Sequence, residues 1–124
     1  MSKHETPLTR KFWNEVGGTL IEEFLAVSKG KDNAQRLIDG VIILDGETRI
    51  AKTSEVNIKG KKIIVIQTKA SRLGMYLMGQ SIISRDLMMK FEPGHIRSVI
   101  LCNKDDSVLR PIAESYGLEV VIYN

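Results

Sequence analysis

The sequence predicts an α/β fold in which a mixed β-sheet is flanked by helices, in the order αβββαβαβ. Apolar residues recur at helical spacing near the N-terminus and again in residues 72–91, while short β-branched runs separated by turn residues lie between them. The chain then closes as strand, helix, strand, a pattern that needs a right-handed crossover and gives a parallel pair. We therefore expect an antiparallel meander followed by parallel C-terminal strands.

The first half of the chain supplies the meander. A helix begins at Pro7 and ends before Gly17-Gly18, because apolar residues recur on one face at Leu8, Phe12 and Val16. Residues 19–27 fit either a helix or a strand, and we favour a strand because a glycine pair precedes them and a turn signal follows at residues 30–33. Further strands are expected at residues 36–44, 53–58 and 62–67, with Gly60 as a turn.

The second half alternates helices and strands. Ser71 is a suitable N-cap for a long helix over residues 72–91, which ends before Pro93-Gly94. Its apolar and methionine positions exceed one narrow stripe, which indicates a core-facing helix that also offers an interface. A strand at residues 96–102, a helix at 105–116 and a strand at 118–123 complete the chain.

Composition sets the class of protein. A chain of 124 residues forms a single domain (residues 1–124), and its 43% hydrophobic and 27% charged residues are ordinary for a globular protein. No apolar run is long enough to span a bilayer, and the N-terminus lacks the apolar stretch of a signal peptide. We therefore expect a cytoplasmic protein without a membrane partner. The lone Cys102 is expected to be a small core residue.

The most informative pattern is a pair of polar sites in strands that are otherwise apolar. Asp39 lies in the second expected strand, and 28 positions later (67 − 39) an apolar run ends in Gln67-Thr68-Lys69. A buried carboxylate or ammonium group costs several kcal/mol unless something compensates for it. A bound metal ion would compensate the carboxylate, and a phosphate would compensate the ammonium group. The simpler alternatives are a turn at Asp39 and a strand-end lysine with its amine in solvent at Lys69.

These residues carry a family resemblance. The element order, the Asp in the second strand and a Gln-x-Lys tripeptide at the end of a later strand resemble the PD-(D/E)XK nuclease superfamily, which has the restriction-endonuclease-like fold. Gln67 departs from the commoner acidic residue, but Gln-x-Lys is similar to the form in virus-type replication-repair nucleases and Holliday-junction-resolvase-like members. Those relatives carry a Gln in the next helix, and Gln80 stands 11 positions after Lys69 (80 − 69). The resemblance covers residues 8–121.

The resemblance implies a metal-dependent DNA endonuclease that uses Mg²⁺ or Mn²⁺. Asp39 and the side-chain carbonyl of Gln67 would be metal ligands, with the main-chain carbonyl of Thr68 as a third. Lys69 would orient or deprotonate the attacking water, or stabilise the charge that develops in the transition state. Gln80 would belong to the same site, although a helix-interior hydrogen bond is its plain alternative.

A further acidic ligand is expected. The resemblance places it in the first helix, which matches Glu15, although an exposed helical Glu is the ordinary explanation of that residue. Glu22 is the alternative, because an antiparallel pairing of residues 19–27 with 36–44 puts it on the same face as Asp39, whereas Glu23 points away in that register. We favour Glu15.

Basic residues concentrate in one part of the chain. The net charge is only +3, yet residues 51–72 hold six basic residues against one acidic residue. Such a surface suits a polyanion, and we expect DNA contacts from Lys59, Lys61, Lys62, Ser71 and Arg72. A solvated hairpin tip is the alternative for the three lysines, and helix capping for Ser71.

Three functional classes are therefore open. The first, which we favour, is a metal-dependent nuclease that works as a homodimer through the helix at residues 72–91, because cutting two strands needs two sites related by a two-fold axis. The second is a nucleic-acid-binding module on the same fold that has lost catalysis. The third is a structural or oligomerising subunit.

Overall fold

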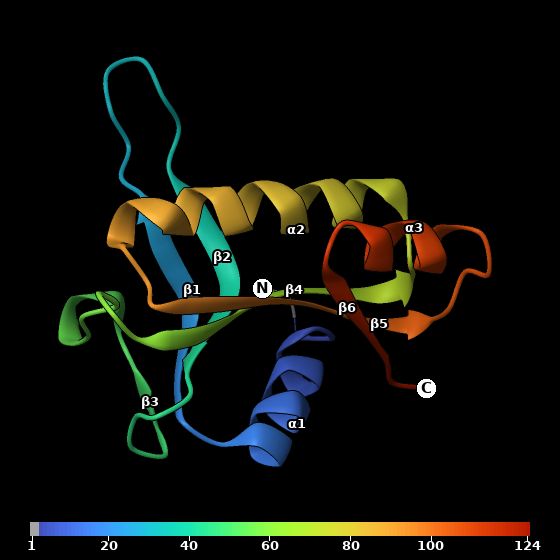
Figure 1. Cartoon of the computed structure of the whole chain (residues 1–124), viewed down its shortest axis with the longest axis horizontal. Coiled ribbons are helices and arrows are strands. Elements are labelled where there is room, and N and C mark those ends of the chain that lie inside the picture. Colours follow the sequence, from blue (N-terminus) through green and yellow to red (C-terminus); the bar gives the residue numbers. More distant parts are fainter. Residues whose placement is uncertain (1–2) are drawn as a thin grey trace.

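A six-stranded mixed sheet forms the centre of the molecule, with helices on both faces (Figure 1). The computed structural model describes residues 3–124. The elements are α1 (Thr6–Val16), β1 (Thr19–Val27), β2 (Arg36–Ile43), β3 (Arg49–Ala51), the 3₁₀ helix η1 (Thr53–Glu55), β4 (Lys62–Arg72), α2 (Met75–Met88), the 3₁₀ helix η2 (Met89–Phe91), β5 (His95–Lys104), α3 (Leu109–Ser115) and β6 (Leu118–Ile122). The strand order is β3-β1-β2-β4-β5-β6. The predicted α/β class and mixed sheet are confirmed, with four strands before α2 where the predicted order αβββαβαβ counts three.

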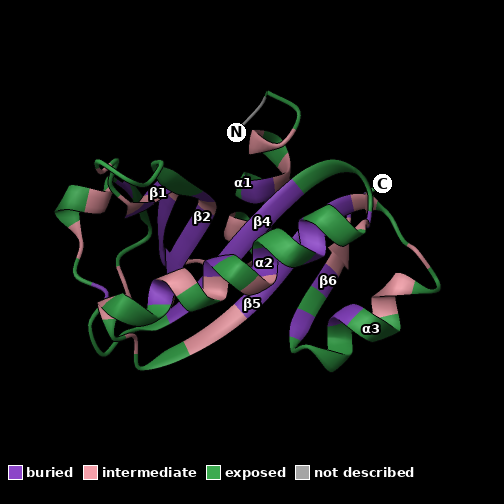
Figure 2. Ribbon diagram, turned by 90° about the horizontal axis from the view of Figure 1, so that it is seen from above, coloured by how far each residue is buried: buried purple, intermediate pink, exposed green. Residues whose placement is uncertain are grey.

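The sheet is antiparallel on one side of β4 and parallel on the other. β1, β2 and β4 form the antiparallel meander, while β5 and β6 continue the sheet in parallel. α1 covers one face, and α2 and α3 cover the other (Figure 1). β4 is the central strand, and its residues Ile63, Ile64, Val65 and Ile66 are all fully buried. Figure 2 shows that this burial ends in the last part of β4, which is exposed and runs beside the start of α2.

One predicted strand is wrong. Residues 53–58 contain the 3₁₀ helix η1 and no strand, and the short strand β3 lies before them, parallel to β1. Side chains satisfy the backbone here: Glu55 Oε1 accepts the N–H of Lys52 at 2.7 Å, and Thr53 Oγ1 accepts the N–H of Leu25 at 3.0 Å. Such local bonds compete with a strand ladder, although the apolar residues of the segment produced a strand signal.

The boundary between β4 and α2 also differs from the prediction. Ser71 does not cap a helix, because β4 continues to Arg72, which pairs with Lys104 of β5. α2 instead begins at Met75, after Gly74 as its N-cap. The strand gains five residues beyond its expected end at Gln67, and these residues lie at the candidate functional site. The other predicted elements are confirmed, with α3 shorter than expected.

The glycine pair between α1 and β1 is required by the backbone. Gly17 and Gly18 have φ of 79° and 83°, and the N–H of Gly17 donates to Trp13 O at 2.7 Å to close the helix. A Cβ on Gly18 would overlap the carbonyl oxygen of Ile43, whereas a Cβ on Gly17 would meet open space. The two positions therefore share backbone strain and differ in packing.

We predict that Gly17→Ala lowers the free energy of unfolding by about 1–3 kcal/mol, from backbone strain alone. Gly18→Ala should cost roughly 1–3 kcal/mol more, because the methyl group displaces the start of the β1–β2 ladder. Urea unfolding of the two variants measures the difference. Equal losses would contradict the close approach of Gly18 to β2.

Candidate functional site at the strand fork

β2 and β4 separate at one end of the sheet. Their ladder runs from the pair Ile43 and Ile63 to the pair Gly40 and Ile66, and stops there. Beyond that point β4 pairs only with β5. The edge of β4 that faced β2 therefore leaves backbone groups without a ladder partner at Thr68 and the residues after it. We call this opening the fork, defined by Asp39, Glu5 and the backbone of residues 68–70.

Two carboxylates satisfy the open edge. Asp39 Oδ2 accepts the N–H of Thr68 at 2.9 Å, and Glu5 Oε2 accepts the N–H of Ala70 at 3.4 Å. In an antiparallel strand the N–H and C=O of one residue point to the same edge, so the carbonyl of Thr68 also faces the fork. Carboxylates from two segments outside β4 thus lie along the same strand edge as a main-chain carbonyl of β4.

The surroundings of Asp39 disfavour its ionised form. Its side chain is half-buried, and burial is the largest cause of a raised pKa. The hydrogen bond from Thr68 opposes this shift, while the charges of Glu5 and Glu23 add to it. The raised pKa means that burial and like charge outweigh the single N–H donor. A cation in the fork would reverse that balance.

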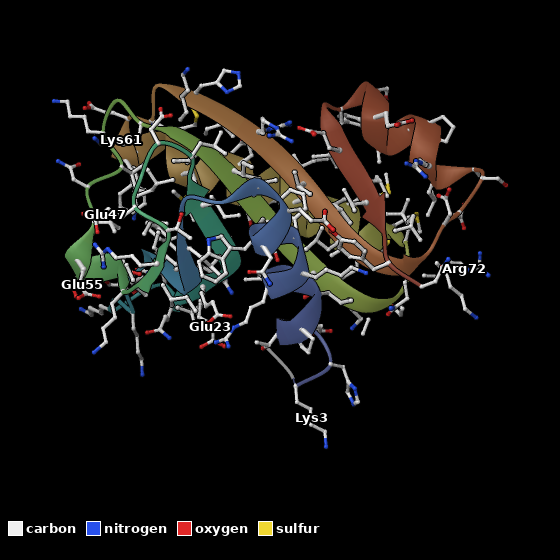
Figure 3. All side chains as sticks on the ribbon, turned by 90° about the horizontal axis from the view of Figure 1, so that it is seen from below. Lys3, Glu23, Glu47, Glu55, Lys61 and Arg72 are labelled. Atoms are coloured by element: carbon white, nitrogen blue, oxygen red, sulfur yellow. The ribbon has the colours of Figure 1, made fainter. Side chains whose placement is uncertain are left out.

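Glu23 reaches this region through an unusual backbone conformation. Its φ of 50° lies in the left-handed region, between the ladder pairs Glu22–Gly40 and Phe24–Ile38. Glu23 therefore lies opposite Asp39, contrary to the expectation that it points away. The regular alternation on which that expectation rested breaks at this residue. Figure 3 shows Glu23 on the face that carries α1.

The structure does not bring Glu15 to Asp39. The carboxylate of Glu15 accepts a hydrogen bond from the hydroxyl of Tyr123 at 2.9 Å. Burial and this contact raise the pKa of Tyr123 to about 12. Glu15 lies ten residues along α1 from Glu5, which is about 15 Å at the rise of an α-helix. The first helix does supply an acid to the fork, but from its opposite end.

Glu22, the alternative acid, is already paired. Both of its oxygens accept hydrogen bonds from the guanidinium of Arg10, at 2.9 and 3.1 Å. This bidentate pair joins α1 to β1 on the face covered by α1. Glu22 therefore shapes the surroundings of the fork without contributing a carboxylate to it.

The residues of the Gln-x-Lys tripeptide divide between the two faces. Gln67 and Thr68 are each 4% exposed. Thr68 Oγ1 shares a hydrogen bond of 2.8 Å with Thr9 Oγ1 of α1, whereas Gln67 Nε2 donates to Ser84 Oγ of α2 at 2.6 Å. Lys69 follows as an exposed residue and pairs in the ladder with Cys102, beneath α2 and α3. It is adjacent in the chain to the N–H that Asp39 accepts.

A hollow lies beside the fork, against α2. Its volume is about 580 Å³, and the side chains around it include those of Arg36, Gln67, Tyr76, Gln80 and Ile83. Gln80 thus lines the same hollow as Gln67, and no contact joins it to Asp39 within residues 3–124. Among residues 3–124, no hydrogen-bond donor contacts the side-chain oxygen of Gln67, so this acceptor is open on the wall of the hollow.

The basic residues form two separate groups. Lys61 and Lys62 are exposed at the start of β4, and nearby Lys59 forms an ion pair with Glu92 at 3.4 Å. Arg72 ends the same strand and donates to Asp105 O at 2.7 Å. Lys61 and Arg72 lie at opposite ends of the molecule in Figure 3. The fork is therefore close to Ser71 and Arg72, and about 20 Å along the strand from Lys62.

The fork fits a hard divalent cation through a mixed set of oxygens. Within residues 3–124, no three His, Cys, Asp or Glu side chains are grouped closely enough to hold a metal by themselves. Asp39, the Thr68 carbonyl and Glu5 instead supply carboxylate and carbonyl oxygens, which Mg²⁺ and Mn²⁺ prefer. The N–H groups that anchor the two carboxylates are two residues apart, about 7 Å, so Glu5 would turn inward to share an ion.

Comparisons with protein-family models, curated proteins and solved structures find no match to this chain. A search of the helices within residues 3–124 finds none with the length and apolar character needed to cross a bilayer. The inference of function therefore rests on the chemistry of the fork and the hollow beside it. The sequence indicated Asp39 and Thr68, but Glu5 and Glu23 gave no signal beyond being acidic.

We predict that Asp39→Asn stabilises the protein at neutral pH. A raised pKa means that the folded state holds its proton more tightly, so the cost of the charge is absent below the unfolded pKa of about 3.9 and complete above the folded pKa. Asn keeps an oxygen for the N–H of Thr68 without the charge. Thermal unfolding at pH 7 should therefore show a higher Tm for the variant, and melts near about pH 3 should nearly coincide.

Asp45→Asn is the matched control, since Asp45 is an exposed carboxylate at the other end of β2. The Tm of Asp45→Asn should equal that of the wild type at both pH values. A lower Tm for Asp39→Asn at pH 7 would mean that the carboxylate stabilises the fold, and the account of a strained acidic site would fail.

Proposed function

We propose that this protein is a Mg²⁺- or Mn²⁺-dependent endonuclease that hydrolyses phosphodiester bonds in DNA, related to the PD-(D/E)XK superfamily and its restriction-endonuclease-like fold. The observation that carries the proposal is the fork, where a half-buried Asp39 with a raised pKa meets the open edge of β4 next to Lys69. The sequence pattern Asp39, Gln67, Lys69 and this geometry support the same chemistry. A cytoplasmic location accords with that role.

Phosphodiester hydrolysis needs an in-line water and neutralisation of the charge that develops in the transition state. A bound divalent ion supplies Lewis-acid stabilisation and a more acidic water. Asp39, the Thr68 carbonyl and Glu5 would hold that ion. Gln67, which the resemblance gives as a neutral ligand, is held by Ser84 on the α2 face and lines the hollow instead. Lys69 would orient the attacking water or take its proton, since a lysine amine shifts its pKa readily near other charges.

The DNA contacts follow from where the cations lie. Ser71 and Arg72 continue β4 directly beyond the fork, so they are placed to hold the phosphates that flank the reacting one. Lys59, Lys61 and Lys62 lie at the far end of β4 and would contact DNA about 20 Å away, roughly six base pairs along a duplex. Two separated groups of this kind suit an extended polyanion better than a small phosphate ester.

A homodimer accords with this activity. α2 and η2 expose large apolar side chains at Met75, Ile83 and Met89, with exposed fractions of 76%, 58% and 57%. One fork per chain cuts one strand, and a two-fold contact through these helices would present two forks to the two strands of a duplex or junction. The structural or oligomerising subunit would use the same surface without the fork.

The nucleic-acid-binding module that lacks catalysis is the second candidate. One observation favours it: within the described residues, the acidic side chains do not form a ready-made cluster of three. That module would bind DNA through the same cations and would not depend on Asp39. Cleavage and binding must therefore be measured on the same variants.

We predict that the wild type nicks or cuts DNA with Mg²⁺ or Mn²⁺, and that Asp39→Asn lowers the rate by more than about a hundredfold, since even outer-shell partners of a metal ligand are worth ~10–100-fold. Gel assays on supercoiled, flap and four-way-junction DNA measure the rate. Glu5→Gln should lose activity as well, whereas Glu15→Gln, at the other end of α1, should remain within about twofold because its partner is Tyr123.

DNA binding without cleavage by the wild type would favour the inactive module. Cleavage that survives Asp39→Asn would reject the fork as the active site. Loss of activity in Glu15→Gln but not in Glu5→Gln would reverse the assignment of the acid from α1.

A further inference from the structure

The hollow beside the fork has a composition unlike that of an ordinary surface depression. Tyr76 is 79% exposed at its edge, and apolar side chains of β2 and α2, Leu37 and Ile83, also line it. Its volume of about 580 Å³ lies within the roughly 300–1,000 Å³ of sites that hold small organic groups. No carboxylate of the described residues borders it.

Three polar groups around the hollow have no hydrogen-bond partner among residues 3–124. The side chains of Arg36 and Gln80 make no hydrogen bond or ion pair there, and the side-chain oxygen of Gln67 accepts none. Gln67 is itself held, because its amide nitrogen donates to Ser84. The hollow thus presents a fixed acceptor and an amide that can both donate and accept, together with a cation from β2 and an aromatic ring from α2.

Planar heteroaromatic rings match this combination. A nucleobase needs an aromatic face to stack on, amide groups that pair with the donors and acceptors on its edge, and no competing negative charge. A second copy of the chain seated there would bury Arg36, Gln67 and Gln80 unpaired, which is costly. Gln67 immediately precedes Thr68, so the hollow also lies next to the fork along β4.

We propose that the hollow takes up one unpaired nucleobase of the DNA, stacked on Tyr76 and hydrogen-bonded to Gln80, while the neighbouring phosphate lies at the fork. This rests on the proposed nuclease function and specifies its substrate class: DNA with an unpaired base at the cleavage position, as at a bulge, flap or junction. A fully paired duplex would have to unstack a base first, at a cost of a few kcal/mol. Met75 and Ile83 line the hollow and would face the base, so the two-fold contact would use Met89 of η2, which does not line it.

The test compares the affinity for two short fluorescein-labelled duplexes, one fully paired and one with a single unpaired adenine, by fluorescence anisotropy in EDTA. The wild type should prefer the duplex with the unpaired base. Tyr76→Ala should weaken binding of that duplex by roughly five- to hundredfold, the range for one stacked base, and leave the affinity for the paired duplex unchanged. Tyr116→Ala is the matched control, a 56% exposed tyrosine of the α3 end.

Gly79→Leu is the second variant. A Cβ on Gly79 meets no atom within 4 Å, and this residue lines the hollow, so leucine fills the space while improving the helix. Gly79→Leu should also abolish the preference for the duplex with the unpaired adenine. Equal affinities of the wild type for the two duplexes, or no DNA binding, would overturn the pocket, as would a preference that survives both variants.

The result is independent of catalysis, because EDTA removes any metal. A preference for the unpaired base in a protein that does not cleave DNA would keep the pocket and remove the nuclease. Cleavage of DNA by a protein that shows no preference for the unpaired base would keep the nuclease and remove the pocket. A change in molecular mass on Tyr76→Ala, by light scattering, with the base preference intact would assign the hollow to a second copy instead.

Discussion

The hydrogen bond from the N–H of Thr68 to the carboxylate of Asp39 links β2 to β4 at the fork. β2 leaves β4 after Gly40, and a backbone N–H exposed by that separation must find another acceptor. A side chain from the departing strand provides it, so the two strands stay close without a ladder. This arrangement removes a carboxylate from water, and the burial raises the pKa of Asp39.

The docking of α1 decides which acids reach this place. Thr9 is fully buried and bonded to Thr68, and it lies one helical turn after Glu5. This contact places the first residues of α1 over the end of β4, so Glu5 reaches Ala70. The far end of the helix is fixed separately, by the bond between Glu15 and Tyr123 of the last segment. One helix therefore supports the fork at one end and the C-terminal strand region at the other.

The balance of charges at the fork opposes the ionised form of Asp39. Asp39 receives one N–H bond, while Glu5 and Glu23 add like charge, and the net effect opposes ionisation. A site built only for stability would pair that carboxylate with a guanidinium, as β1 does with Glu22 and Arg10. Residues that break local rules without such compensation are where binding and catalysis are expected.

The sequence predicted the architecture and part of the site. The mixed sheet, its parallel C-terminal strands and the place of Asp39 within an otherwise apolar strand follow from periodicity, since burial dictates residue type there. Periodicity failed where side chains bond to the backbone, as at Glu55, and where β4 continued past Thr68 to pair with β5. Glu5 and Glu15 were indistinguishable in sequence, because only the Thr9–Thr68 contact determines which end of α1 meets the fork. The left-handed conformation of Glu23 gave no sequence signal, since it is set by pairing with β2.

The central claim is that the fork binds a divalent cation, and calorimetric titration with Mn²⁺ tests it most directly. The account predicts heat of binding for the wild type and for Glu15→Gln, lost in Asp39→Asn and weakened in Glu5→Gln. Binding should also weaken as the pH falls through the raised pKa of Asp39, because only the ionised carboxylate is a ligand. Mn²⁺ binding of equal strength in the wild type and Asp39→Asn, or none in either protein, would contradict it.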